Sequence, residues 1–406
     1  MGARLPMAVY AKRNKLINFS RIMRSIWMNP GISRIEIARK LALDKSTVTN
    51  LASELIEIGV VQVGGARDSG PQGGRKPIQL TIKGDFAAVI GIEIQTDYYQ
   101  AVAANLSGEI LYSEAHKSDV SRELLPKRFA EVYERVMAEV AKSGVPVLGV
   151  GLGISGIVNP HKGVIIKSIP MGITEPYSFA RDIAAKLNVP AYVENDANAC
   201  ALGELAFHKS ERLRNFLFAL VEFRKGDFSK SEYGGIGIGL GIVLDGRVHY
   251  GSEFYGGEFR SVFWNGPSKG QLSLPLDRIR RISTDADVQM EFSRELARNL
   301  AVFVNTLNLN QVFIGGDLQS YRIPFDEMLA EEIRRNWVYD PDDIHCTVSY
   351  SSVGEKAVAY GAAGMLLERL FTSRPILSGE DRTITGITNL LDRLEPIGKR
   401  SPVEGN

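Results

Sequence analysis

Two acids and two amides stand within five residues of one segment, VENDANACALGE: Glu194, Asn195, Asp196 and Asn198. The residues before this segment, KLNVPAYV, predict a helix end, a proline and a short apolar strand. The polar cluster is therefore expected where a strand stops and a helix begins, which is the edge at which α/β folds usually bind ligands. An aspartate in this place could be a catalytic base, or it could only hold a ligand.

The surrounding residues predict an α/β body that positions this cluster. Apolar segments after residue 84 predict three strands joined by tight turns, an amphipathic helix over 124–144 and a buried strand over 147–155. This order is the core of the actin-like (ribonuclease H-like, sugar kinase-type) fold. The pattern starts again at 215–223 and 234–251, which predicts a second lobe. Two such lobes normally close on a ligand held between them.

The first 83 residues predict a separate DNA-binding head. They carry 14 Lys and Arg against 5 Asp and Glu, a net charge of +9, whereas the remaining residues have a net charge of −8. Apolar spacing predicts helices over 14–29, 33–43 and 45–59, and then two strands over 60–65 and 76–82 around a glycine-rich loop. This order is typical of a winged helix-turn-helix. The alternative is a three-helix packing module that binds no nucleic acid.

Local signals set the helix ends and the candidate DNA contacts. Ser33 and Glu36 form a capping box, Asp44 can cap the third helix, and Gly59 ends it. The second helix of such a motif places its N-terminal residues against base edges, and a wing can reach phosphates or the minor groove. The candidate contacts are the polar residues near the turn and the cations of the wing: Arg34, Lys45, Ser46, Thr47, Thr49, Asn50, Arg67, Arg75 and Lys76.

Six segments, taken in order, resemble the ROK family (repressors, open reading frames and kinases), and specifically its branch of transcriptional regulators. They are GGRKP in the head, GLGISGIVNP, VENDANACALGE, GIGIGLGIVLDGRVHYG, GGE at 256–258, and LNLNQVFIGGDL. The resemblance covers about residues 15–375. It implies a winged helix-turn-helix fused to a sugar-kinase-like body.

The residues that would bind nucleotide phosphates depart from the family's pattern. Kinases of the family carry a first turn D-x-G-G-T, whereas the matching residues here run from Glu93 to Asp97, with Gln95 and Thr96 in place of both glycines. A carboxylate repels phosphate, and side chains block the close approach of backbone N–H groups. The second turn, usually G-T-G-x-G, has Ile236 in place of threonine. We therefore expect tight hairpins, no nucleotide and no enzyme activity.

The resemblance assigns ligand binding to Asn195, Asp196 and Glu258. Asp196 matches the family's catalytic base, while Asn195 and Glu258 match residues that contact sugar hydroxyls. The alternatives are that Asn195 and Asp196 only cap a helix, and that Glu258 is a solvated surface acid. Arg260 is new relative to the family. It could clamp an anionic ligand, or it could pair with Glu258, and we favour the pair.

The sequence predicts neither a metal nor a cofactor. Ser261 replaces the histidine that ligates zinc in the family, and residues 262–275 contain no cysteine. The two cysteines, Cys200 and Cys346, are expected to be small buried residues in a reducing cytoplasm. The sequence contains no run of 18 apolar residues, so no membrane contact is expected.

Together these features predict a cytoplasmic transcription regulator, a repressor of carbohydrate genes. The head would bind operator DNA as part of a homodimer or homotetramer, and the body would bind a sugar or sugar derivative. Two alternatives stay open: an ATP-dependent sugar kinase with a DNA-binding head, and a regulator switched by a protein partner. The expected domains are the head (1–83), a first lobe (84–192), a second lobe whose last helix could pack back on the first (193–375), and a C-terminal extension (376–406).

Overall fold

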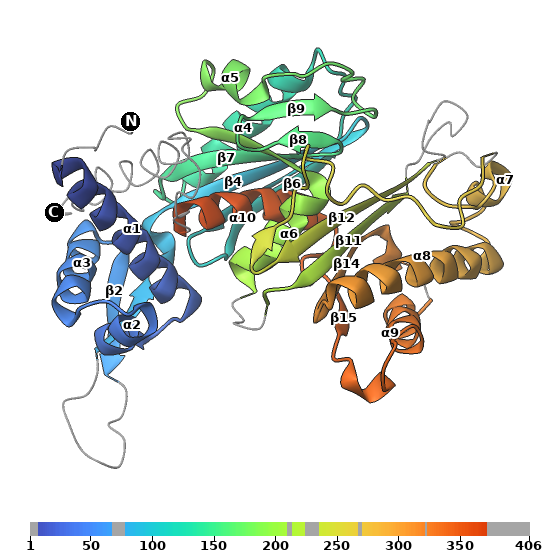
Figure 1. Cartoon of the computed structure of the whole chain (residues 1–406). Coiled ribbons are helices and arrows are strands. Elements are labelled where there is room, and N and C mark those ends of the chain that lie inside the picture. Colours follow the sequence, from blue (N-terminus) through green and yellow to red (C-terminus); the bar gives the residue numbers. More distant parts are fainter. Residues whose placement is uncertain are drawn as a thin grey trace, which may run out of the picture.

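The computed structural model describes residues 7–66, 78–208, 213–223, 235–266, 270–320 and 323–371. It has the expected α/β architecture, with a small head followed by a body built on two five-stranded sheets (Figure 1). The candidate wing residues Arg67, Arg75 and Lys76 lie outside the described residues, as does the predicted C-terminal extension.

The head has the predicted helix-turn-helix order and a three-stranded sheet in the order β1-β3-β2, in which β1 lies between α1 and α2 and the other two strands follow the helices. β2 and β3 pair antiparallel as the two sides of the predicted wing. The elements are α1 (Met7–Met28), β1 (Ile32–Ser33), α2 (Arg34–Leu41), α3 (Lys45–Ile58), β2 (Val61–Ala66) and β3 (Ile78–Ile82).

Local contacts explain where these helices begin and end. The Ser33 hydroxyl accepts a hydrogen bond from the backbone N–H of Glu36 at 3.3 Å, and the Ser33 backbone N–H donates to the Glu36 carboxylate at 2.8 Å, which confirms the capping box. α3 ends at Gly59, whose φ of 88° favours glycine. The expectation for Asp44 is wrong in one respect. It occupies the N-cap position, but its side chain makes no capping hydrogen bond and lies exposed, where water can solvate the carboxylate.

The first sheet of the body has the strand order β10-β7-β4-β5-β6. β10, β7 and β4 are parallel, whereas β4, β5 and β6 form antiparallel hairpins. The predicted amphipathic helix, α4, packs on this sheet through buried residues that include Phe129 and Val136. The elements are β4 (Ala88–Ile94), β5 (Tyr98–Asn105), β6 (Ile110–Lys117), α4 (Leu125–Ala141), β7 (Val147–Ile154), β8 (Ile157–Asn159), β9 (Val164–Lys167), α5 (Phe179–Ala184) and β10 (Ala191–Asn195).

The second sheet repeats this pattern in the order β13-β12-β11-β14-β15. β11, β14 and β15 are parallel, and β11, β12 and β13 form antiparallel hairpins. The internal repeat expected from the sequence is therefore present. The elements are β11 (Phe216–Phe223), β12 (Ile236–Leu244), β13 (Arg247–Val248), α7 (Leu276–Ile279), α8 (Ala286–Leu307), β14 (Gln311–Gly316), α9 (Phe325–Arg335) and β15 (Thr347–Tyr350).

Two helices that pack against each other join the sheets (Figure 1). α6 (Asp196–Phe207) lies on β11 and β12 of the second sheet, and α10 (Ala357–Phe371) lies on β4 and β7 of the first. Their backbones approach closely because glycine occupies the contact. A Cβ added at Gly361 would meet the Ala199 carbonyl oxygen at 2.2 Å. The domain boundary expected after residue 192 falls inside β10, a strand of the first sheet.

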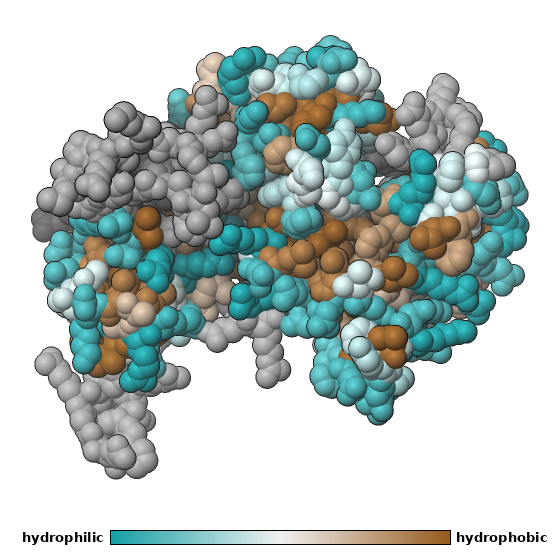
Figure 2. Space-filling view, viewed as in Figure 1, coloured by the Kyte–Doolittle hydropathy of each residue, from teal (hydrophilic) through white to brown (hydrophobic). Residues whose placement is uncertain are grey.

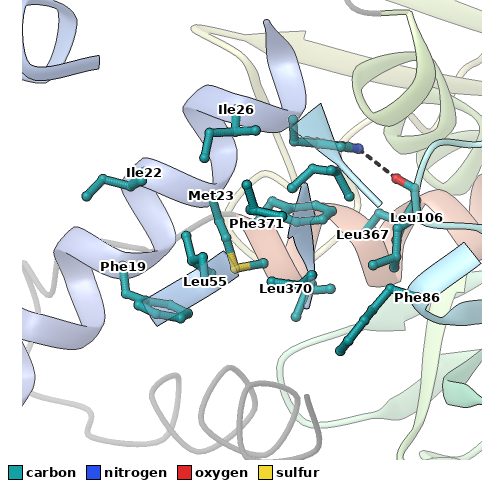
Figure 3. Close-up of a cluster of buried hydrophobic side chains, with 14 of the residues drawn as sticks. Phe19, Ile22, Met23, Ile26, Leu55, Phe86, Leu106, Leu367, Leu370 and Phe371 are labelled. Carbon is teal, nitrogen blue, oxygen red and sulfur yellow. Dashed lines mark hydrogen bonds between the residues drawn. The ribbon is translucent and has the colours of Figure 1, made fainter. Parts of the chain in front are cut away.

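The head and the body share one hydrophobic core, shown in Figure 3. Trp27 at the end of α1 stacks on Phe371 at the end of α10, with ring centroids 4.6 Å apart. The Trp27 indole N–H donates to the Leu106 carbonyl at 3.1 Å, the dashed line of the figure. Beside the rings, the Arg24 guanidinium lies 2.8 Å from the Glu368 carboxylate. The head is thus packed directly on the helix that covers the first sheet.

Candidate ligand site and DNA-binding surface

Asn195 and Asp196 lie where β10 ends and α6 begins, as expected. The Asn195 side chain caps the helix, because its oxygen accepts from the backbone N–H of Asn198 at 3.0 Å. Its amide nitrogen donates to the Gly156 carbonyl and to Asp196 Oδ1, both at 2.9 Å. Asp196 Oδ1 also accepts from the backbone N–H of Ala197 at 2.8 Å. Asn195 therefore caps α6, and its amide also holds the Asp196 carboxylate; both contacts are compatible with a further role in ligand binding.

Glu194 connects the site to the second half of the body. Its side chain is fully buried and accepts hydrogen bonds from the backbone N–H of Asn195 at 3.0 Å and from the Tyr250 hydroxyl at 2.8 Å. Burial raises the pKa of Glu194 to about 7. Tyr250 follows β13 of the second sheet, so this hydrogen bond joins the two halves of the body beside the polar cluster. Tyr250 lies 56 residues from Glu194, and no local pattern in the sequence predicts this contact.

Glu93 and Gln95, which match the first phosphate-binding turn of the family's kinases, belong to a polar network. Glu93 Oε1 accepts from the Tyr98 hydroxyl at 2.5 Å and from the Gln95 amide at 3.3 Å. The same Gln95 nitrogen lies 3.4 Å from Glu222 Oε1 on the second sheet. Burial, followed by the negative charges of Asp196 and Asp317, raises the pKa of Glu93 to about 7. Gln95 is buried, and its amide lies between Glu93 of the first sheet and Glu222 of the second.

Glu258 lies near Asp196, whereas Arg260 does not complete the expected pair. The Glu258 backbone bridges to Gly239 of β12, and a Cβ added at Gly239 would lie 3.7 Å from Asp196 Oδ1. Desolvation, and then the charge of Asp196, raise the pKa of Glu258. The Arg260 guanidinium stacks over Trp264, with Cζ 4.4 Å from the ring centroid. The favoured Glu258–Arg260 ion pair is therefore not the contact that Arg260 makes.

Within the described ranges, no three His, Cys, Asp or Glu side chains gather closely enough to hold a metal ion. Cys200 is buried as expected, but Cys346 is only half-buried, so that part of the expectation is wrong. It stands at the start of β15, a strand at the edge of its sheet, where neighbouring elements cover it incompletely. None of the described helices is both long and apolar enough to cross a membrane.

The candidate DNA contacts in the helices lie together at the start of α2 and α3. Lys45, Ser46, Thr49 and Asn50 are exposed, and Thr47 is half-buried. The Thr49 hydroxyl already donates to the Lys45 carbonyl at 2.7 Å, which leaves it only as an acceptor. Arg34, the first residue of α2, is half-buried. Figure 2 shows hydrophilic residues over much of the visible surface of the head.

Comparison with known proteins agrees with the fold of the head and with that of the body. Residues 89–259 match the model of the ROK family, and residues 20–62 match a model of winged helix-turn-helix DNA-binding domains. The chain contains a ROK family domain. The family resemblance seen in the sequence is thereby confirmed, and the ROK domain follows a winged helix-turn-helix head.

Individual proteins of known name resemble the chain over most of the body. A xylose repressor from Caldicellulosiruptor bescii is 29% identical over 246 residues, which cover 60% of this chain and 58% of that repressor. A crystal structure of a ROK family transcriptional regulator, a homologue of the E. coli MLC protein, has a TM-score of 0.71 at 19% identity and covers 94% of this chain and 99% of that one. A ROK family glucokinase from Streptomyces griseus, solved with glucose and AMPPNP, has a TM-score of 0.51 at 18% identity, covering 69% and 99%. The fold therefore occurs in both regulators and kinases.

Proposed function

We propose that the chain is a ligand-responsive transcriptional regulator, a repressor of carbohydrate genes that acts in the cytoplasm. The observation that carries this proposal is the packing of a winged helix-turn-helix head on α10 of a ROK domain. The similarity to a xylose repressor supports it. The head binds operator DNA through the residues at the start of α2 and α3 and through the wing, as part of a homodimer or homotetramer.

The effector is a sugar or sugar derivative held by Asn195, Asp196 and Glu258. The Asn195 amide fixes Asp196 Oδ1, and Glu258 is an exposed residue whose backbone bridges to Gly239 of β12 and whose pKa is raised by partial desolvation and by the charge of Asp196. Carboxylates accept hydrogen bonds from sugar hydroxyls, and a charged acceptor contributes roughly 1.5–3 kcal/mol per bond. Arg260, two residues after Glu258 and stacked on Trp264, is the cation that we propose for an anionic group of the effector.

We infer that the ROK domain does not transfer phosphate. A kinase needs backbone N–H groups that approach the phosphates closely. Here the buried Gln95 amide lies within hydrogen-bonding distance of two carboxylates, Glu93 and Glu222, beneath the corresponding turn. These acidic side chains support the proposal, because negative charge beside this turn would repel a phosphate.

The test is operator release, measured with a DNA sequence selected from a random pool and with D-xylose, D-glucose and their phosphates as probes. Asp196→Asn keeps an oxygen for the two hydrogen bonds that Asp196 Oδ1 accepts, so the fold should survive. The variant should bind DNA like the wild type and should respond at least tenfold more weakly to the active sugar. The matched control is Asp245→Asn, an exposed acid of the β12–β13 turn.

A normal sugar response of Asp196→Asn would place the effector elsewhere. If the wild type releases ADP from ATP with any sugar of the panel and Asp196→Asn does not, the kinase alternative replaces the sensor. If no sugar acts but a protein captured from lysate releases DNA, the regulator is switched by a partner.

A further inference from the structure

A pocket of about 460 Å³ lies at the opposite end of α6 from Asp196. Eight residues separate Asp196 from Glu204 at its floor, which corresponds to about 12 Å along the helix axis. The wall is built from four segments: the second half of α6, the residues between β15 and α10, the start of α10, and the β5–β6 turn. Its volume lies in the range of ordinary small-molecule sites, about 300–1,000 Å³.

A buried carboxylate faces this pocket. The Glu204 side chain is 7% exposed, and its Oε1 accepts a hydrogen bond from the Ser351 hydroxyl at 3.1 Å. Its Oε2 lies 3.6 Å from His208 Nδ1, too far for a good hydrogen bond. A carboxylate has about four acceptor positions, so Glu204 retains acceptor capacity toward a ligand. Burial raises the pKa of Glu204 to about 7, because the charged carboxylate is held away from water, and the hydrogen bond from Ser351 offsets this only in part.

A cation and an aromatic stack complete the lining. Lys356 Nζ donates to the Ser113 hydroxyl at 3.1 Å and carries three N–H donors, so further donors remain. Phe207 and Tyr360 stack with their ring centroids 4.0 Å apart. The Tyr360 hydroxyl donates to the Gly108 carbonyl at 2.6 Å, which fixes the rings at the pocket wall. The pocket therefore combines one carboxylate (Glu204), one ammonium (Lys356), the exposed His208 imidazole and apolar ring surface.

We propose that this pocket is a second effector site, which binds a small neutral polyhydroxylated molecule such as a monosaccharide or polyol. Its hydroxyls donate to Glu204 and accept from Lys356, while its C–H face lies against Phe207. Neutral ligands fit because an anion would meet the Glu204 carboxylate and an organic cation would meet Lys356. The site is separate from the effector site proposed at Asp196, and the two proposals can be tested independently.

The pocket also borders the contact between head and body. Gly108, in its wall, lies two residues from Leu106, whose carbonyl accepts the Trp27 indole hydrogen bond. Tyr360, in the same wall, belongs to α10, whose last residue Phe371 stacks on Trp27. Two groups hold Trp27 at the end of α1: the Leu106 carbonyl and the Phe371 ring. A ligand that shifts Gly108 or Tyr360 therefore acts on the segments that carry these two groups.

The experiment is calorimetric titration of the full chain with D-xylose, D-glucose, glycerol and myo-inositol. Asp196→Asn serves as the background, because it is expected to weaken binding at the other proposed site at least tenfold. We expect at least one of the four compounds to bind this protein with millimolar or better affinity, and adding Glu204→Gln or Lys356→Met to weaken that binding at least tenfold. Adding Glu139→Gln or Lys142→Met, exposed residues at the end of α4, should leave it unchanged.

Three results would overturn the proposal. The first is that none of the four compounds binds Asp196→Asn at concentrations up to 50 mM, a limit of about 2 kcal/mol in binding free energy. The second is that Glu204→Gln and Lys356→Met bind the compounds as tightly as the background does. The third is that D-glucose 6-phosphate, titrated in the same way as an anionic probe, binds more tightly than D-glucose and loses this binding in Glu204→Gln. Ser351→Ala, which leaves both charges in place, should weaken binding less and guards against misfolding of the charge variants.

Discussion

One ion pair between the head and the body allows their packing to be measured. Arg24 of α1 and Glu368 of α10 lie 2.8 Å apart, with side chains 30% and 10% exposed. Arg24→Met and Glu368→Gln, made singly and together, form a double-mutant cycle. A hydrogen bond to a charged group contributes roughly 1.5–3 kcal/mol, and the partial exposure of Arg24 reduces this. We therefore expect a coupling energy of about 1–2 kcal/mol.

The assay is urea unfolding followed by tryptophan fluorescence, because Trp27 lies in the same interface. The matched control is the pair Lys142–Glu139, which has an N–O distance of 2.6 Å but side chains 70% and 38% exposed. Its coupling should be only about 0.3–0.5 kcal/mol. A coupling at Arg24–Glu368 no larger than that of the control would refute the argument that partial burial strengthens the pair.

The same variants test whether α10 carries a signal. If the head responds to the body through this contact, Glu368→Gln should bind operator DNA without ligand but release it less completely when sugar is added. A measurable coupling energy with an unchanged sugar response would mean that the pair stabilises the fold but does not couple sugar binding to DNA release.

Three further predictions follow from other parts of the molecule. The pKa of Glu194 is raised from 4.5 to about 7, so the folded state binds more protons than the unfolded state between these values, and stability should fall as pH rises from about 4.5 to 7. Glu194→Gln should remove up to about 3 kcal/mol of that fall, which urea unfolding at several pH values will measure. Thr47→Ala or Asn50→Ala should reduce discrimination between DNA sequences. Lys76→Ala should weaken binding to all sequences and lower the slope of log affinity against log salt concentration by about one. If all three variants only lose affinity equally in a binding assay, α3 is not the recognition helix. Purified protein should contain far less than one zinc per chain by elemental analysis, and stoichiometric zinc that resists a chelator would contradict this.

The sequence predicted the elements well wherever a local signal exists. The capping box at Ser33, the helix end at Gly59 and the strand–helix junction at Asn195 depend on residues within a few positions of each other. Asp44 shows the limit of such rules, because residue type allows a cap but does not determine where the side chain points.

Contacts between distant segments could not be predicted in this way. The Tyr250 hydroxyl reaches Glu194, and Gln95 reaches Glu222 on the other sheet, 127 residues away. Each of these pairs depends on how the two sheets face each other. The spacing of apolar residues along the chain does not predict that arrangement. The pocket at Glu204 was missed for the same reason, because four separate segments build it. Arg260 was assigned to the nearest acid in sequence, although the nearest favourable surface in space is the Trp264 ring.

The packing of α10 explains why changes in the ROK domain should reach the head. A Cβ at Gly91 would lie 1.9 Å from the Ala359 carbonyl oxygen, and one at Gly151 would lie 2.5 Å from that of Ala362, so the helix backbone rests directly on the first sheet. Because the backbones touch at these glycines, α10 has little room to slide on the sheet, and we expect the two to move together. The C-terminal end of this rigid helix is Phe371, against which the head is stacked. A ligand that changes how the two sheets face each other should therefore move the head, together with α10 and the first sheet, relative to the second sheet.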